Sequence, residues 1–338
     1  MKDLHRFRFA LAWWLPLAVG FAAWLSPWAA WLTMLGHQIL FAALERVPAW
    51  NQSPRAQASS AWHRWCLRLH VPLQAGLLGW ALWLVAQGDV STGAAVALGL
   101  GVGGITGSQG ITFAHELGHS RSRVDRFLAW ALMCSVNYAH FMVEHYRGHH
   151  PRAATFEDPA SARRGESLWQ FLPRTLAGSF VSAWRLEARQ LRQLQRGWQR
   201  SPLLWASAVQ LLWLFVLWAL FGPKALLFWL VQSAYAVFLL EAINYIEHYG
   251  LQRQTANGKL EPFAMQHAWN ADAVMTNSIL ANLQRHSDHH VHAWKPYAEL
   301  EALPGPQLPT GYAGCLFLAT VPALWRRVME PRLNALAA

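Results

Sequence analysis

The sequence predicts an all-α, polytopic membrane protein with a histidine-rich metal site at one end of its spanning helices. Three observations predict this class. Charged residues make up only 14% of the 338 residues and hydrophobic residues 54%, whereas about 25% of a soluble domain is charged. Several apolar runs are long enough to cross a bilayer. Nine of the sixteen histidines lie in four short clusters. We expect residues 1–338 to form a single membrane domain.

Six apolar runs predict a bundle of six transmembrane helices, because each run approaches the ~17–25 residues that a spanning helix needs. They cover residues 9–25, 28–44, 71–86, 92–114, 202–220 and 225–246. Basic residues precede the first run and fill the polar stretch before the third, which predicts a cytoplasmic N-terminus. A cleaved signal peptide is disfavoured, since more apolar sequence follows the first run at once.

The fourth run contains Gly99-Leu-Gly-Val-Gly-Gly104, which formally matches the dinucleotide-binding pattern G-x-G-x-x-G. No strand precedes this pattern and no acidic residue follows at the expected distance, so nucleotide binding is a weak interpretation. Gly99, Gly103 and Gly107 recur every four residues. This spacing predicts the close approach of a neighbouring helix, or of a substrate.

Six crossings leave residues 115–200 and 247–338 on the cytoplasmic side, together with both termini. All four histidine clusters then fall on the same side of the membrane, which neither inference required. The apolar run 127–143 ends in a cluster and is therefore expected to be a cytoplasmic or re-entrant helix. An amphipathic stretch, residues 168–194, is expected to lie along the membrane interface.

The clustered histidines have helical spacing, which places their imidazoles on shared helix faces. They are His115, His119, His145, His149, His150, His248, His286, His289 and His290. Imidazole suits iron, copper, zinc and nickel as a ligand. Nine imidazoles are too many for one ion of about four to six ligands, so the pattern predicts two ions with positions left open for a small reactant.

Other classes explain fewer residues. His115-Glu-Leu-Gly-His119 matches the zinc-protease motif with Glu116 as general base, but seven clustered histidines then have no task. A metal transporter would need ligands along a path through the spans, whereas the four histidine clusters are expected on one side of the membrane. The formal charge of +10 could favour nucleic acid, yet the basic residues lie between apolar runs, which favours a membrane surface. The cysteines form no C-x-x-C pair for zinc or iron–sulfur binding.

Polar residues beside the clusters can orient the ligating imidazoles through the second ring nitrogen. These candidates are Glu144, Asp158, Glu241, Asn244, Glu247, Asp288, His140 and His292. A surface or capping role is an equally good interpretation of the acidic ones. Because Glu241 lies within the sixth apolar run, we expect its carboxyl to face the bundle interior.

The four histidine motifs resemble those of membrane-bound alkane 1-monooxygenases, within the fatty acid desaturase and hydroxylase superfamily. The stretches are His-Glu-Leu-Gly-His119, Glu-His-Tyr-Arg-Gly-His-His150, Asn-Tyr-Ile-Glu-His-Tyr-Gly-Leu251 and Leu-Gln-Arg-His-Ser-Asp-His-His290. Segments ending at Ser161 and Tyr312 are similar as well. The similarity runs from about residue 70 to the C-terminus, while the preceding part is short for this family.

The resemblance implies a non-haem di-iron centre held by the nine histidines, with no catalytic residue beyond the metal centre. It also implies hydroxylation of the terminal methyl of medium- or long-chain n-alkanes with O2, in a bacterial inner membrane. Family members receive electrons from rubredoxin, so a separate rubredoxin and an NAD(P)H-dependent rubredoxin reductase are expected. Arginines within residues 121–126 and 163–200 could steer an acidic rubredoxin, or only fix topology. A methyl-arene substrate such as xylene, or an acyl chain to be desaturated or hydroxylated, is the alternative.

Overall fold

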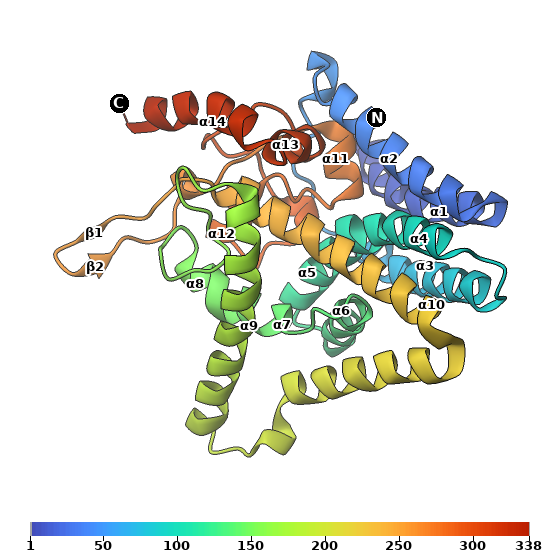
Figure 1. Ribbon diagram of the computed structural model, residues 1–338. Coiled ribbons are helices and arrows are strands. Elements are labelled where there is room, and N and C mark those ends of the chain that lie inside the picture. Colours follow the sequence, from blue (N-terminus) through green and yellow to red (C-terminus); the bar gives the residue numbers. More distant parts are fainter. Residues whose placement is uncertain (1, 338) are drawn as a thin grey trace. The chain divides into compact units, whose positions relative to one another are not determined.

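The structure is a computed structural model that describes residues 2–337, and its regular elements are almost entirely helical (Figure 1). Within the described residues, the strands are the short antiparallel pair β1 (Thr255–Ala256) and β2 (Lys259–Leu260). This composition of elements confirms the all-α prediction.

The chain folds into two compact units, each assembled from three separate segments. Unit 1 comprises the residues up to Gln38, Ser60–Val143 and Trp184–Leu240; unit 2 comprises Ile39–Ser59, Glu144–Ala183 and the chain from Glu241 onward. Among the described helices, α2, α7, α9 and α10 begin in one unit and end in the other. The expectation of a single membrane domain stays a prediction.

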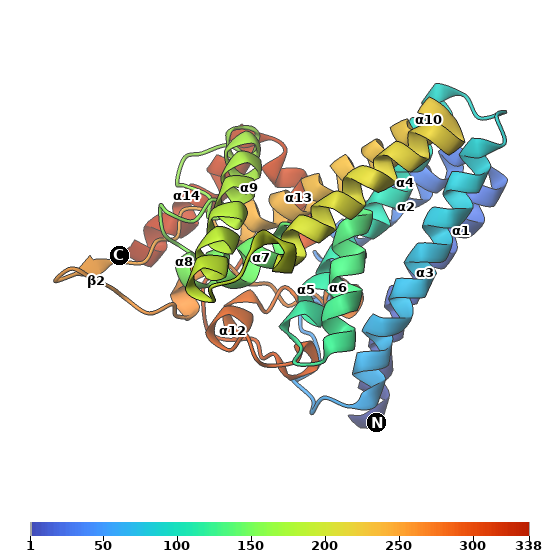
Figure 2. The same cartoon turned by 90° about the horizontal axis from the view of Figure 1, so that it is seen from below.

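Unit 1 contains most of the long apolar helices. Its elements are the 3-10 helix η1 (Lys2–Trp13), α1 (Trp14–Leu25), most of α2 (Pro27–Leu44), α3 (Ala61–Ala86), α4 (Thr92–Ile105), the π-helix η3 (Thr106–Ile111), α5 (Thr112–His119), α6 (Arg123–Ser135), the start of α7 (Phe141–Glu144), the end of α9 (Leu168–Gln193), η5 (Trp198–Arg200) and most of α10 (Pro202–His248). Helices α1 and α3 pack side by side (Figure 2).

Four helices among the described residues are long and apolar enough to cross a membrane: His5–Leu25, Ala61–Ala86, Thr92–His119 and Pro202–His248. The last of these joins the two expected spans at 202–220 and 225–246. It bends at Gly222, where φ is 80° and ψ is 178°, a conformation that glycine adopts readily. Helix α2, over the expected span at 28–44, is not among the four. The number of crossings therefore stays a prediction.

The fourth expected span is longer than the apolar run indicated. Its helix passes through the π-helical segment Thr106–Ile111 and then continues beyond residue 114 to His119. It therefore carries both histidines of the first cluster. π-Helical turns are rare and occur often at functional sites. The helix therefore delivers His115 and His119 directly from an apolar segment.

The glycines of α4 bring two neighbouring helices close to it. A Cβ built on Gly103 would lie 2.7 Å from the carbonyl oxygen of Gln232 on α10, and one on Gly101 would lie 2.7 Å from the carbonyl carbon of Ala30 on α2. Gly107 likewise faces the α10 backbone. The close helix approach predicted from the spacing of these glycines is confirmed, with α10 as the neighbour.

A buried polar network connects the helices that lead to the first cluster. Thr106 donates a hydrogen bond to Oε1 of Gln232 at 2.8 Å, and Nε2 of Gln232 donates to the carbonyl of Ser135 at 2.8 Å. Gln74 on α3 donates to the Ser135 hydroxyl at 3.0 Å. Polar side chains among apolar helices satisfy one another in this way, which fixes η3, α3, α6 and α10 against each other.

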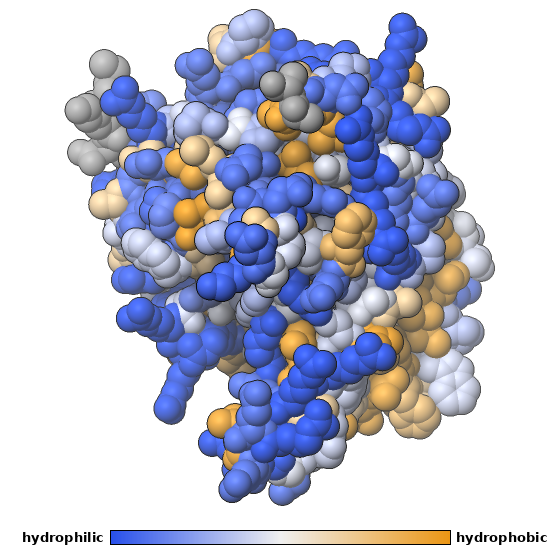
Figure 3. Space-filling view, turned by 90° about the vertical axis from the view of Figure 1, so that its left-hand side faces the viewer, coloured by the Kyte–Doolittle hydropathy of each residue, from blue (hydrophilic) through white to orange (hydrophobic). Residues whose placement is uncertain are grey.

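Unit 2 consists of shorter helices joined by ordered loops. Its elements are the end of α2, the 3-10 helix η2 (Pro48–Trp50), the π-helix η4 (His145–His149), α8 (His150–Arg152), the start of α9, the end of α10, β1, β2, η6 (Met265–His267), α11 (Val274–Ile279), α12 (His286–Val291), η7 (Tyr297–Glu299), α13 (Tyr312–Ala319) and α14 (Pro322–Ala337). The face from which the β1–β2 hairpin projects is largely hydrophilic (Figure 3).

Buried polar contacts hold these loops. Arg285 donates to Oδ1 of Asp272 at 2.9 Å and to the carbonyls of Leu300 and Pro54 at 2.7 and 2.8 Å. Because Arg285 directly precedes His286, this arginine anchors the start of α12. A guanidinium satisfied by several acceptors tolerates burial far better than an unpaired charge.

Candidate metal centre

Four buried imidazoles of unit 2 converge on one point. His149, His248, His286 and His290 each offer a ring nitrogen, and these nitrogens lie within 4.8 Å of one another. Nε2 of His149 is 3.2 Å from Nε2 of His290, and Nε2 of His286 is 3.2 Å from Nε2 of His248. Four converging imidazoles are a suitable ligand set for one transition-metal ion.

A second group in unit 2 contains His145, His150 and His289. Their ring nitrogens also lie within 4.8 Å of one another, and Nε2 of His150 is 3.0 Å from Nε2 of His145. Three protein ligands with further positions open are typical of catalytic metal sites. This group can therefore hold a second ion.

Unit 1 presents the first cluster as a pair on α5. The ring centroids of His115 and His119 are 5.0 Å apart in an edge-on arrangement, as expected for residues four apart on a helix. His115 is buried and His119 is half-buried. The two rings are thus oriented together by one helix end.

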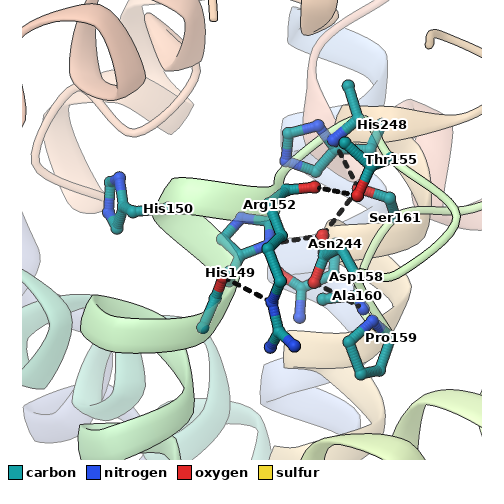
Figure 4. A network of polar contacts seen from close by, with 12 residues as sticks. His149, His150, Arg152, Thr155, Asp158, Pro159, Ala160, Ser161, Asn244 and His248 are labelled. Atoms are coloured by element: carbon teal, nitrogen blue, oxygen red, sulfur yellow. Dashed lines mark hydrogen bonds and ion pairs between the residues drawn. The ribbon is translucent and has the colours of Figure 1, made fainter. Parts of the chain in front are cut away.

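The second cluster departs from the grouping that its spacing indicates. On an α-helix His145 and His149, four residues apart, would share a face. In the structure His145 and His150 belong to one group and His149 to the other, and Figure 4 shows the rings of His149 and His150 pointing in different directions. The reason is the π-helical turn, in which the amide of His150 donates to the carbonyl of His145.

An aspartate fixes the ring of His149. Nδ1 of His149 lies 2.8 Å from Oδ2 of Asp158, and the same oxygen accepts the Ser161 hydroxyl at 2.6 Å (Figure 4). Burial raises the pKa of Asp158, but the neighbouring His149 ring and the hydrogen bonds from His149 and Ser161 outweigh it and hold this pKa below its usual value. An ionised Asp158 keeps the proton on Nδ1, so that Nε2 presents its lone pair to the group.

A carboxyl group also lies close to His286, without hydrogen-bond geometry. Oε1 of Glu247 lies 3.2 Å from Nδ1 of His286 and accepts the hydroxyl of Tyr312 at 2.6 Å. All three side chains are buried. Tyr312 therefore fixes the carboxylate that faces the imidazole.

The donor set fits metal ions in its protonation state as well. Burial, and then the neighbouring imidazoles, lower the pKa of His290 well below its usual value. A neutral imidazole is the form that binds a metal. His290 therefore presents a buried, neutral nitrogen donor to the four-histidine group, and imidazole donors suit iron, zinc or copper.

Comparison with known proteins identifies the family. The family model named fatty acid desaturase matches residues 89–315, a range that includes all four histidine motifs. Alkane 1-monooxygenase 2 of Pseudomonas aeruginosa is 40% identical over 324 residues, covering 93% of this chain and 85% of the relative. The chain belongs to the alkane 1-monooxygenase family. The resemblance inferred from the four motifs is thereby confirmed.

Two further relatives carry different names, one an alkane 1-monooxygenase and the other a component of a xylene/toluene monooxygenase. The alkane 1-monooxygenase of Ectopseudomonas oleovorans is 40% identical over 269 residues, covering 78% of this chain and 67% of the relative. The hydroxylase component of a xylene/toluene monooxygenase of Pseudomonas putida is 27% identical over 273 residues, covering 79% and 73%. Family membership and the histidine groups together fit a di-metal hydroxylase. The apolar helices and these relatives indicate a membrane protein.

Three of the acidic candidates bind partners other than a clustered histidine. Glu144 forms an ion pair with Arg152, Oε1 to Nη2 2.6 Å. Oδ1 of Asp288 lies 2.6 Å from Nδ1 of His292 and 3.0 Å from Nζ of Lys295. Asp288 thus orients His292, which lies in neither histidine group.

The third of these, Glu241, lies on the face of α10 that also carries Asn244. Its Oε2 accepts the hydroxyl of Thr175 at 2.8 Å and the amide of Asn244 at 3.2 Å. These contacts connect α9 to α10. The remaining candidate, His140 of unit 1, packs against the ring of Tyr138 with centroids 4.1 Å apart and lies in neither group.

Several contacts to the four-histidine group were not predicted from the sequence. Phe263 stacks on His290 with ring centroids 4.7 Å apart and an interplanar angle of 26°, and Nδ1 of His248 lies 3.4 Å from the carbonyl oxygen of His267. An aromatic residue in a loop and a backbone carbonyl carry no sequence signal. Tyr312 lies in a segment that resembled the family, and that resemblance was the available signal for it.

Proposed function

We propose that this enzyme is a non-haem di-iron monooxygenase that converts medium- or long-chain n-alkanes to 1-alkanols, using O2 and electrons delivered by rubredoxin. One observation carries the proposal. In a chain 40% identical to an alkane 1-monooxygenase over most of its length, seven buried or half-buried histidines of unit 2 gather into two groups of metal-binding nitrogens.

We assign all nine clustered histidines to two iron ions. His149, His248, His286 and His290 would hold one ion, and His145, His150 and His289 the other. His115 and His119 are assigned to the second ion on the resemblance of the His-Glu-Leu-Gly-His motif and on the open positions of a three-imidazole group. Asp158 and Glu247 keep their imidazoles in the ligating orientation, as outer partners of metal-bound histidines do.

The chemistry of the substrate supports a redox metal. A terminal methyl offers no group for acid–base catalysis, so two bound irons would supply the oxidising power to place one oxygen atom of O2 into the C–H bond. The residues of the chain bind and orient. Neutral imidazoles provide the donors, buried carboxylates fix them, and the apolar helices keep water away from an apolar substrate.

We further propose six crossings of the bacterial inner membrane, with both termini and the histidines on the cytoplasmic side. The bend at Gly222 divides Pro202–His248 into two arms that match two expected spans, and α2 is an apolar helix of 18 residues. A separate rubredoxin and an NAD(P)H-dependent reductase would bring the electrons. Exposed arginines at the end of α9, such as Arg185 and Arg192, favour an acidic partner.

A methyl-arene is the second candidate substrate, because a hydroxylase component of a xylene/toluene monooxygenase is 27% identical to this chain. Both substrates are oxidised at a methyl group. They differ in width, so a narrow access path would favour the linear chain.

Metal analysis combined with product analysis tests the function. The purified protein, reduced through rubredoxin and its reductase, is given octane, hexadecane, p-xylene and an acyl chain in turn. We expect two irons per chain and 1-octanol or 1-hexadecanol as the main product. Oxidation of p-xylene faster than that of octane and hexadecane would identify a methyl-arene, in place of an alkane, as the preferred substrate. A double bond in the acyl chain, or zinc in an active preparation, would contradict the proposal.

A further inference from the structure

The turn that carries the second histidine cluster is the point at which the two histidine groups of unit 2 separate. His145 and His150 lie in one group and His149 in the other. On an α-helix, residues 145 and 149 would point about 40° apart and residues 145 and 150 about 140° apart. The π-helical turn, closed by the bond from the amide of His150 to the carbonyl of His145, inserts one residue. It brings the ring centroid of His150 to 4.6 Å from that of His145, while the centroids of His145 and His149 stay 5.3 Å apart.

A proline makes the open turn favourable here. Pro151 has no amide hydrogen, and in an α-helix its ring would clash with the carbonyl four residues earlier, that of Arg147. Widening the turn relieves this clash. It also removes regular hydrogen bonds, since the wider ladder and the proline leave helix carbonyls without their usual donors. A π-turn at this position therefore needs support from a side chain.

Arg152 provides that support with three hydrogen bonds. Its Nε donates to the carbonyl of Gly148 at 3.0 Å, inside the turn. Its Nη2 donates to Oε1 of Glu144 at 2.6 Å, just before the turn, and to the hydroxyl of Ser182 on α9 at 2.9 Å. The guanidinium thus connects both ends of the turn and anchors them to a neighbouring helix.

Gly148 is the residue over which this ion pair lies. A Cβ built on Gly148 would come within 2.5 Å of both Nη2 of Arg152 and Oε1 of Glu144. A side chain at this position would displace the ion pair from the turn. The absence of a side chain at Gly148 therefore allows the Arg152–Glu144 ion pair to lie across the turn.

We propose that Arg152 is a positioning residue that holds the His145–His149 turn in its π-helical form and so distributes the cluster between the two metal sites. Without it the turn loses the hydrogen bonds that hold Gly148, Glu144 and Ser182 together, and His150 moves away from His145 and His289. The four-histidine group keeps its other three members, which lie on α10 and α12. The inference rests on the proposed function, in that each histidine group binds one ion.

The test measures metal binding and needs no turnover. Wild type, Arg152→Gln and Gly148→Ala are purified in detergent, stripped with a chelator and titrated with Co2+ followed by visible absorption, with bound metal counted by mass spectrometry. Wild type is expected to bind two Co2+ per chain. In both variants we expect one binding step to weaken about tenfold or more, while the other stays within about twofold of wild type.

Two further variants control for general damage. Arg164→Gln removes another ion pair of unit 2, Arg164 with Glu330, away from the turn, and both binding steps should be unchanged. Ser182→Ala removes one anchor of Arg152 and should weaken the same single step by less. If Arg152→Gln and Gly148→Ala do not fold, Ser182→Ala still tests the role of Arg152.

The outcomes separate the two claims. A wild type that binds fewer than two Co2+ overturns the two-metal function. A wild type that binds two, with both steps unchanged in Arg152→Gln, or in Ser182→Ala where Arg152→Gln does not fold, overturns the role of Arg152 alone. Equal weakening of both steps also contradicts it, since the four-histidine group should be spared.

Discussion

The carboxylate of Asp158 lies 2.8 Å from Nδ1 of His149 and at the same time accepts the hydroxyl of Ser161. The hydroxyl of Ser161 in turn accepts the amide of Ala154 at 2.8 Å. A loop just downstream of the second cluster thereby fixes one imidazole of that cluster. The orientation of His149 is thus set by sequence-local residues before any metal binds.

Replacing Asp158 by asparagine should weaken one metal-binding step about tenfold to a hundredfold. The amide keeps the size of the side chain but loses the charge that holds the proton on Nδ1. Equilibrium titration with Co2+ measures the loss, with Asp89→Asn, an exposed site in unit 1, as the control. Unchanged affinity in Asp158→Asn would show that Asp158 has only a structural role.

Removing a proposed ligand should abolish turnover, whereas removing another histidine should not. His289→Ala is expected to lose nearly all alcohol formation, because the three-histidine group of unit 2 would retain two donors. His37→Ala is the control, since His37 contacts Thr33 and Trp14 on unit 1. The measurement is 1-octanol formed per chain with excess reductant. Full activity in His289→Ala would contradict the ligand assignment.

Glu45 of unit 2 connects the end of α2 to the start of α13. Its buried carboxylate accepts the hydroxyl of Thr276 at 2.6 Å and the amides of Ala313 and Gly314 at 3.1 and 2.8 Å. Glu45→Gln places an amide NH2 against one backbone N–H. An unsatisfied buried donor costs about 1–3 kcal/mol, so we expect the free energy of unfolding to fall by that order.

The pH dependence of this loss has a definite sign. Burial raises the pKa of Glu45 above its usual value, although the bonds from Thr276, Gly314 and Ala313 oppose it. The folded state therefore holds the proton more tightly than the unfolded state. Its stabilising effect is complete below the unfolded pKa and is lost as the pH rises through the folded pKa. The difference between wild type and Glu45→Gln in thermal unfolding should shrink toward higher pH; a difference that grows would contradict the sign.

The glycines of α4 allow a matched test of helix packing. Gly103→Ala places a Cβ 2.7 Å from the backbone oxygen of Gln232, which cannot move without displacing α10. Overpacking of this kind costs about 1–3 kcal/mol. Gly36→Ala on α2 meets nothing within 4 Å and should be neutral or stabilising. Thermal unfolding in one detergent compares them, and equal stability of the two variants would contradict the packing.

Periodicity and composition predicted the helices well because they depend on local apolar patterns and on glycine. The Gly99–Gly107 spacing predicted a close helix neighbour, and the gap between the apolar runs 202–220 and 225–246 matches the bend at Gly222. The grouping of the second cluster was not predictable from spacing. An i, i+4 rule assumes an α-helix, and the π-turn between His145 and His149 depends on Pro151 and on tertiary contacts of Arg152.

Helix α10 runs without a further break from the Gly222 bend to His248, its last residue. An apolar helix tilts to match the thickness of the bilayer around it. We therefore expect lipid chain length, through the tilt of this helix, to influence the orientation of the imidazole at its end. Under the proposed topology, lipid composition would then contribute to the geometry around His248.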